Sequence, residues 1–107
     1  MISKELLSEV LKGERYHFKI YGINNQHFKI IIYGRDFQEE ELNIHELAHK
    51  CKEWAFIKGY KLASYKSKNN YICKDPFNGN EPYEGDDTEP EAIFKACEWI
   101  MEHKHGW

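Results

Sequence analysis

Two stretches near the start of the chain alternate between apolar and polar residues, residues 15–22 and 26–33. Their apolar positions are Tyr16, Phe18, Ile20, Phe28, Ile30 and Ile32. A period of two places these side chains on one face of an extended chain, which is typical of a strand. The residues Gly22-Ile23-Asn24-Asn25 between them are turn formers, so the pattern predicts a β-hairpin.

Helical spacing of apolar residues predicts three helices, over residues 3–12, about 43–58, and from Thr88 toward the C-terminus. Their stripes are Leu6, Leu7, Val10 and Leu11; Ile44, Leu47, Ala48, Cys51, Trp54 and Ala55; and Ala92, Ile93, Ala96, Cys97 and Ile100. Ser3 precedes the first helix as an N-cap, and Gly59 follows the second as a C-cap. Thr88 and Glu91 have the spacing of a capping box for the third helix.

The remaining segments complete the predicted order of elements. Residues 34–42 read as an acidic loop, residues 60–66 and 70–74 as a second hairpin, and residues 75–87, rich in Pro and Gly, as an irregular loop. The order is therefore αββαββα. We expect a single α+β domain over residues 1–107, in which helices pack on one antiparallel sheet.

Composition gives no support for several classes of protein. The net charge of −3 and the presence of only two arginines give no footprint for direct nucleic-acid binding. No apolar stretch approaches the roughly 18 residues of a membrane span, and no signal-peptide pattern opens the chain, so we expect a cytoplasmic protein. The three cysteines form no CxxC pair and predict neither disulfides nor a thiol zinc site. The aromatic content of 15% indicates core filling, with an exposed aromatic binding surface as the alternative.

Acidic residues gather in residues 36–46 and 81–91, ahead of two predicted helices. We take the following as candidate partner-binding residues: Glu39, Glu40, Glu41, Glu84, Asp86 and Asp87. Such segments complement a basic protein surface, including the nucleic-acid channel of an enzyme. The alternative is structural, because carboxylates near a helix N-terminus interact favourably with the helix dipole.

The sequence His45-Glu46-Leu47-Ala48-His49 has the HExxH spelling of zinc hydrolases, with His45 and His49 as ligands and Glu46 as general base. Catalytic zinc needs a third protein ligand, and spacing singles out none, although His103 and His105 lie near the C-terminus. Asn43 and Glu46 also have capping-box spacing, which would place Glu46 in the first helical turn. We therefore expect no catalytic residue, metal or cofactor, with a zinc-dependent hydrolase as the alternative.

Two segments carry a resemblance to a known group of proteins. Residues 46–55 read ELAHKCKEWA, and residues 87–96 read DTEPEAIFKA. Together they resemble small proteins encoded by phages and prophages, with a C-terminal half built from a helix, a short hairpin and a "DTEPEA" helix. The resemblance implies an accessory protein that binds a host protein in the bacterial cytoplasm. Inhibition of a defence system such as a CRISPR nuclease is one such role. It implies no catalytic residues. The aromatic content leaves a third alternative, a structural or regulatory phage protein that forms a homodimer.

Overall fold

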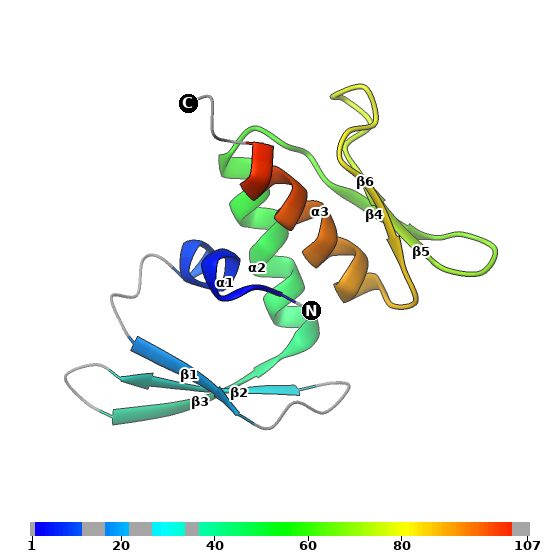
Figure 1. Ribbon diagram of the computed structural model, residues 1–107. Helices are drawn as coiled ribbons and strands as arrows, with labels where there is room; N and C mark the ends of the chain where they lie inside the picture. Colours follow the sequence, from blue (N-terminus) through cyan, green and yellow to red (C-terminus); the bar gives the residue numbers. More distant parts are fainter. Residues whose placement is uncertain (1, 12–16, 22–26, 34–36, 104–107) are drawn as a thin grey trace.

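A computed structural model gives the fold (Figure 1). It describes residues 2–11, 17–21, 27–33 and 37–103, with the strands between residues 17 and 43 described by their backbone. In chain order the elements are α1 (Lys4–Val10), β1 (His17–Tyr21), β2 (His27–Tyr33), β3 (Phe37–Asn43), α2 (Ile44–Ile57), β4 (Ala63–Lys66), β5 (Tyr71–Lys74), β6 (Tyr83–Asp86) and α3 (Glu89–His103). The predicted α+β class is confirmed.

The strands form two antiparallel sheets, with the orders β1-β2-β3 and β4-β5-β6. Both predicted hairpins are present, and each is extended by one further strand. The order of elements is therefore αβββαβββα rather than αββαββα, and the strands are divided between two sheets rather than joined in one.

The prediction of an acidic loop over residues 34–42 is wrong for residues 37–42, because β3 occupies Phe37–Asn43, and residues 34–36 lie outside the described residues. In the register of the sheet, Lys29 of β2 stands opposite Glu41, and Ile30 stands opposite Glu40. Glutamate disfavours strands, but β3 is an edge strand, where charges are common. Opposite charges at facing positions, as at Lys29 and Glu41, also stabilise strand pairing.

The second strand that the pattern missed is β6, within the segment read as an irregular loop. Its four residues, Tyr83–Asp86, pair with β5, so that Tyr83 stands opposite Lys74 and Glu84 opposite Cys73. Gly85 and Asp86 have low strand propensity. Pairing with a neighbouring strand and packing against α3 override that propensity, which no local pattern encodes.

The predicted helix boundaries hold to within two residues. The Ser3 hydroxyl accepts a hydrogen bond from the Leu6 N–H at 3.1 Å, and the Thr88 hydroxyl accepts one from the Glu91 N–H at 3.3 Å. Gly59, with φ of 97°, ends α2: its N–H donates to Phe56 O, and the Tyr60 N–H donates to Ala55 O, the two bonds of a Schellman cap. In the described part of the chain, no helix has the length and apolar character to cross a membrane.

The hydrophobic core lies between α1, α2, α3 and the inner face of the second sheet. In Figure 1, α2 and α3 run side by side, α1 lies against α2, and the sheet β4-β5-β6 lies beyond α3. The predicted stripes of α2 and α3 are buried as expected, and Phe94 joins them. Lys52 of α2 reaches the second sheet, where its ammonium donates to the Ser64 hydroxyl at 2.7 Å.

Candidate functional site

The HExxH residues lie on the exposed side of α2. His45, Glu46 and His49 are all exposed, and together with Lys50 and Glu53 they line an open depression on the surface. Nε2 of His49 is 3.0 Å from a carboxylate oxygen of Glu53, one turn further along the helix. The histidines therefore share a face, as the spacing predicts, but His49 already has an acidic partner.

A catalytic zinc ion needs three protein ligands and one open position. Over residues 2–11 and 44–103, where side chains are described, no three His, Cys, Asp or Glu side chains are grouped closely enough to hold a metal ion. His103 is engaged elsewhere. Its Nδ1–H donates to the Trp99 carbonyl at 2.8 Å, and its ring stacks on that of Trp99 at 3.9 Å. His105 lies outside the described residues.

Glu46 lies in the first turn of α2, as the capping-box interpretation requires. Asn43 is the last residue of β3 and directly precedes Ile44, the first residue of the helix. Asn43 thus occupies the N-cap position, although its side chain lies outside the described residues. An acidic residue in a first turn is also favoured by the helix dipole, so Glu46 has a structural role available that needs no metal.

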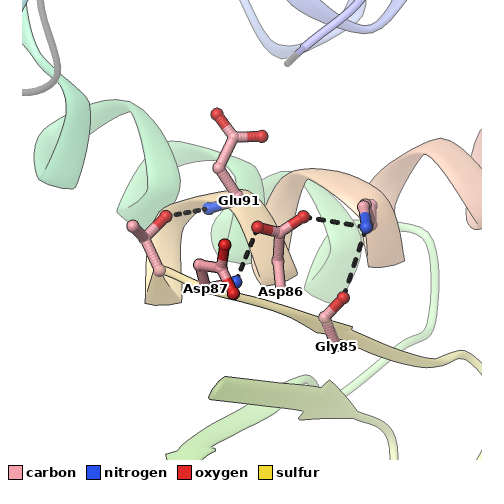
Figure 2. A network of polar contacts seen from close by, with 6 residues as sticks. Gly85, Asp86, Asp87 and Glu91 are labelled. Atoms are coloured by element: carbon pink, nitrogen blue, oxygen red, sulfur yellow. Dashed lines mark hydrogen bonds and ion pairs between the residues drawn. The ribbon is translucent and has the colours of Figure 1, made fainter. Parts of the chain in front are cut away.

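The second acidic segment is partly neutralised by a lysine of α3 (Figure 2). The Lys95 ammonium is 2.8 Å from the Asp86 carboxylate and also donates to the Gly85 carbonyl at 3.3 Å. The other carboxylate oxygen of Asp86 accepts from the Asp87 N–H at 2.6 Å. The hydrogen bond from Lys95 lowers the pKa of Asp86, and the same bond raises the pKa of Lys95.

The three candidate residues of this segment therefore differ. Glu84 stands opposite the buried Cys73, so it lies on the face of the sheet that α3 covers, and it is half-buried. Asp86 is held by Lys95. Asp87 is exposed, and in Figure 2 its backbone N–H joins the network. Of the three, Asp87 is the one that the structure presents most openly to a partner.

The two helices that follow the acidic segments, α2 and α3, run parallel. Cys97, midway along α3, donates through its thiol to the carbonyl of Cys51, midway along α2, at 3.5 Å. Tyr60, just after α2, packs edge-on against Trp99 near the end of α3, with ring centroids 6.1 Å apart. The N-termini of both helices therefore lie at the same end, as Figure 1 shows.

The first acidic segment lies mostly in β3, which is followed directly by α2. Glu39, Glu40 and Glu41 occupy successive strand positions, so that Glu40 belongs to the opposite face from the other two. Their side chains lie outside the described residues. The second segment enters the same end through Asp87, immediately before α3. Both segments therefore lead into the same end of the helical layer, although they lie about 45 residues apart in the sequence.

The three cysteines, far apart in the sequence, also come together. Cys51 of α2, Cys73 of β5 and Cys97 of α3 are each fully buried in the same core cluster. Burial raises the pKa of the Cys73 thiol to about 12. A hydrogen bond with Cys51, together with burial, raises the pKa of Cys97. Thiols of this kind are protonated and act as small apolar groups, so the cluster belongs to the core.

Two further features escaped the sequence patterns. Asp75 is buried, and its carboxylate accepts backbone N–H bonds from Lys61 at 3.0 Å and Phe77 at 2.9 Å. Tyr65 and Tyr83 are exposed on the second sheet, on either side of Lys74. The Asp-Pro pair at residues 75 and 76 marks a turn, and alternation within residues 60–66 could have placed Tyr65 on the outer face.

Compared with known proteins, the chain matches no family model, no curated protein and no solved structure.

Proposed function

We propose that this protein is a non-catalytic, phage-type accessory protein that binds a basic surface of a host protein through the acidic end of its helical layer. One observation carries the proposal: the parallel packing of α2 and α3, which places at one end the two helix N-termini that the acidic segments lead into. The resemblance of residues 46–55 and 87–96 to phage-encoded proteins supports the accessory role.

The chemistry of this end suits a partner that normally holds phosphates. Carboxylates carry the same sign of charge as a nucleic-acid backbone and compete for the same lysines and arginines. Asp87 is exposed there, and β3 brings three consecutive glutamates to the start of α2. A defence nuclease, including a CRISPR nuclease, is a partner class with such a basic channel, and occupation of the channel would inhibit it.

The test is a target-cleavage assay with a purified CRISPR nuclease of the bacterial host, with and without this protein. Two charge-reversed variants are compared with the wild type: Glu39→Lys/Glu40→Lys/Glu41→Lys, and Asp87→Lys. Asp86 is left intact because Lys95 depends on it. The matched control is Glu102→Lys, an exposed residue in the last turn of α3, at the other end of the helix.

We expect the wild type and Glu102→Lys to inhibit cleavage, and both acidic-end variants to lose inhibition. We also expect inhibition to weaken as salt is added, because exposed charge pairs are screened. The same variants are then used in pull-downs to measure binding apart from inhibition. Inhibition that survives both reversals, or is lost equally in Glu102→Lys, would contradict the proposal. Absence of inhibition by the wild type would exclude this partner.

A further inference from the structure

The second sheet has an outer face that no described element covers. Cys73 at the centre of β5 is buried in the core, so its neighbours Ile72 and Lys74 belong to the opposite face. The strand register adds the other outward positions, and the full set is Ala63, Tyr65, Ile72, Lys74, Tyr83 and Gly85. In Figure 1, α3 lies against the other face.

Two tyrosines and one lysine dominate this face. The Lys74 ammonium lies 5.6 Å from the ring centroid of Tyr65 on β4 and 5.7 Å from that of Tyr83 on β6. The rings are 41% and 55% exposed, respectively. A cation at this distance interacts favourably with an aromatic face, so Lys74 helps to fix both rings without covering them.

The residues between the two rings project little from the outer face. Ile72 is buried, yet it lies outside the main core cluster. A Cβ at Gly85 would come within 3.1 Å of Cδ1 of Ile72 and of the Asn70 amide nitrogen. The Ile72 side chain therefore lies across Gly85, in the space that a larger residue would fill. With Ala63 as the remaining outward position, Tyr65 and Tyr83 are the groups that project furthest toward a partner.

A second pair of aromatic ring and lysine lies next to this face. The Phe77 ring is 80% exposed, and the Lys61 ammonium is 5.4 Å from its centroid. Both residues are tethered through their backbone N–H groups to the buried carboxylate of Asp75, which directly follows Lys74. The loop that carries Phe77 is therefore anchored beside the end of β5 at which Lys74 lies.

The outer face is cationic even though the chain is acidic. None of its six outward strand positions carries a carboxylate, and Lys74 contributes a positive charge. Lys61, in the segment that leads into β4, adds a second positive charge next to the Phe77 ring. The acidic residues of β6 point elsewhere, since Glu84 and Asp86 occupy the alternate positions that face α3. The net charge of −3 is thus the sum of an acidic end of the helical layer and a positively charged outer face of the second sheet.

We propose that this outer face binds single-stranded nucleic acid, independently of the acidic end. Bases would stack on Tyr65 and Tyr83, and backbone phosphates would pair with Lys74 and Lys61. The combination of exposed rings and cations is what single-stranded recognition requires. The rings stand on the two outer strands, which lie roughly 10 Å apart, and they are offset by two residues along the strands. One short stretch of unpaired nucleotides can span this separation. A duplex would hide the base faces.

The test measures fluorescence anisotropy of a labelled oligothymidylate and a labelled oligouridylate with the full chain. We expect saturable binding. A plot of the logarithm of the association constant against the logarithm of the salt concentration should have a slope of about −1.4, as two phosphate contacts require. We expect Tyr65→Ala and Tyr83→Ala each to weaken binding roughly 5- to 100-fold, by loss of one base stack. Tyr65→Phe and Tyr83→Phe keep the ring and should bind as the wild type does.

Phe56→Ala is the matched control, because Phe56 is 63% exposed but lies on α2, away from the sheet. Unlabelled duplex of mixed sequence and polyglutamate serve as competitors, and circular dichroism verifies that each variant is folded. Three results would overturn the proposal: no saturable binding, alanine variants that both bind as tightly as the wild type, or displacement by duplex as effective as by single strands. Displacement by polyglutamate with no effect of the alanine variants would instead identify a surface for acidic proteins. The competitor and salt measurements use the wild type, so they decide the matter even if a variant fails to fold.

Discussion

The carboxylate of Asp75 joins two segments that are separated in the chain, because it accepts the backbone N–H of Lys61 at 3.0 Å as well as that of Phe77. Lys61 lies in the connection between α2 and β4, whereas Phe77 lies in the loop between β5 and β6. Asp75 is the single buried charged residue among the side chains that the structure describes. One side chain therefore links the segment that leads into β4 with the loop between β5 and β6.

We predict that Asp75→Ala lowers the free energy of unfolding by roughly 2–4 kcal/mol, because it leaves two backbone donors without a partner. Asp75→Asn keeps one acceptor oxygen and should lose about half as much. Urea denaturation followed by circular dichroism measures both values. The control is Glu102→Gln, an exposed residue that should change stability little. Equal stability of Asp75→Ala and the wild type would show that these bonds contribute nothing.

A second prediction concerns pH and the pair of Asp86 and Lys95. The Lys95 hydrogen bond lowers the pKa of Asp86 below its ordinary 3.8, so the unfolded chain takes up a proton at a higher pH than the folded chain. The pair therefore stabilises the fold above that ordinary value, and its contribution is lost as pH falls through the folded pKa. The contribution is small because both side chains are partly exposed.

Carbon-13 NMR of the side-chain carboxyl groups follows this titration directly. We expect Lys95→Met to return the pKa of Asp86 toward 3.8. Lys50→Met, which removes an exposed lysine of α2 that faces a different surface, should leave it unchanged. If the Asp86 pKa is the same in the wild type and in Lys95→Met, then the ion pair does not form in solution.

The third prediction is that the thiols are inert in the folded protein. Burial and raised pKa values keep Cys73 and Cys97 protonated, and Cys51 is buried with them. A disulfide reagent at mildly alkaline pH should therefore label none of the three in native buffer and all three in guanidinium. A thiol that reacts rapidly in native buffer would place that cysteine outside the core.

The fourth prediction separates capping from catalysis at the start of α2. Asn43→Ala should cost about 1 kcal/mol of stability, as loss of an N-cap does. Glu46→Gln should cost little, because Gln also closes a capping box. Thermal unfolding of the two variants makes the comparison. If Asn43→Ala leaves the free energy of unfolding unchanged, Asn43 is not the N-cap. Glu46 would then have no capping box to close.

The fifth prediction concerns metal. His45 and His49 share the exposed side of α2, but no third ligand stands near them among the described side chains. We expect the purified protein to contain no stoichiometric zinc and to unfold at the same temperature with and without a chelator. Elemental analysis and thermal unfolding test this. One equivalent of zinc, lost in His45→Ala, would revive the hydrolase alternative.

The features that could be predicted from the sequence were local ones. Ser3, Gly59 and Thr88 mark helix ends because each residue satisfies backbone groups within its own turn. The stripes of α2 and α3 were equally readable, since helical spacing alone determines which positions share a face.

The features that the sequence did not reveal depend on partners distant in the chain. Strands β3 and β6 consist largely of residues with low strand propensity and form because β2 and β5 present free edges to them. The convergence of Cys51, Cys73 and Cys97 follows from the packing of two helices on a sheet, which spacing within one element does not encode. The same holds for the acidic end, whose location required knowing that α2 and α3 are parallel.

The direct junction between β3 and α2 has a mechanical consequence. Asn43 ends the strand and Ile44 begins the helix, so no connecting residue separates the first sheet from the helical layer on that side. Strand and helix backbones differ mainly in their φ and ψ angles, and the change occurs here within about one residue. A force applied to β3 is therefore transmitted directly to the first turn of α2, where His45 and Glu46 lie.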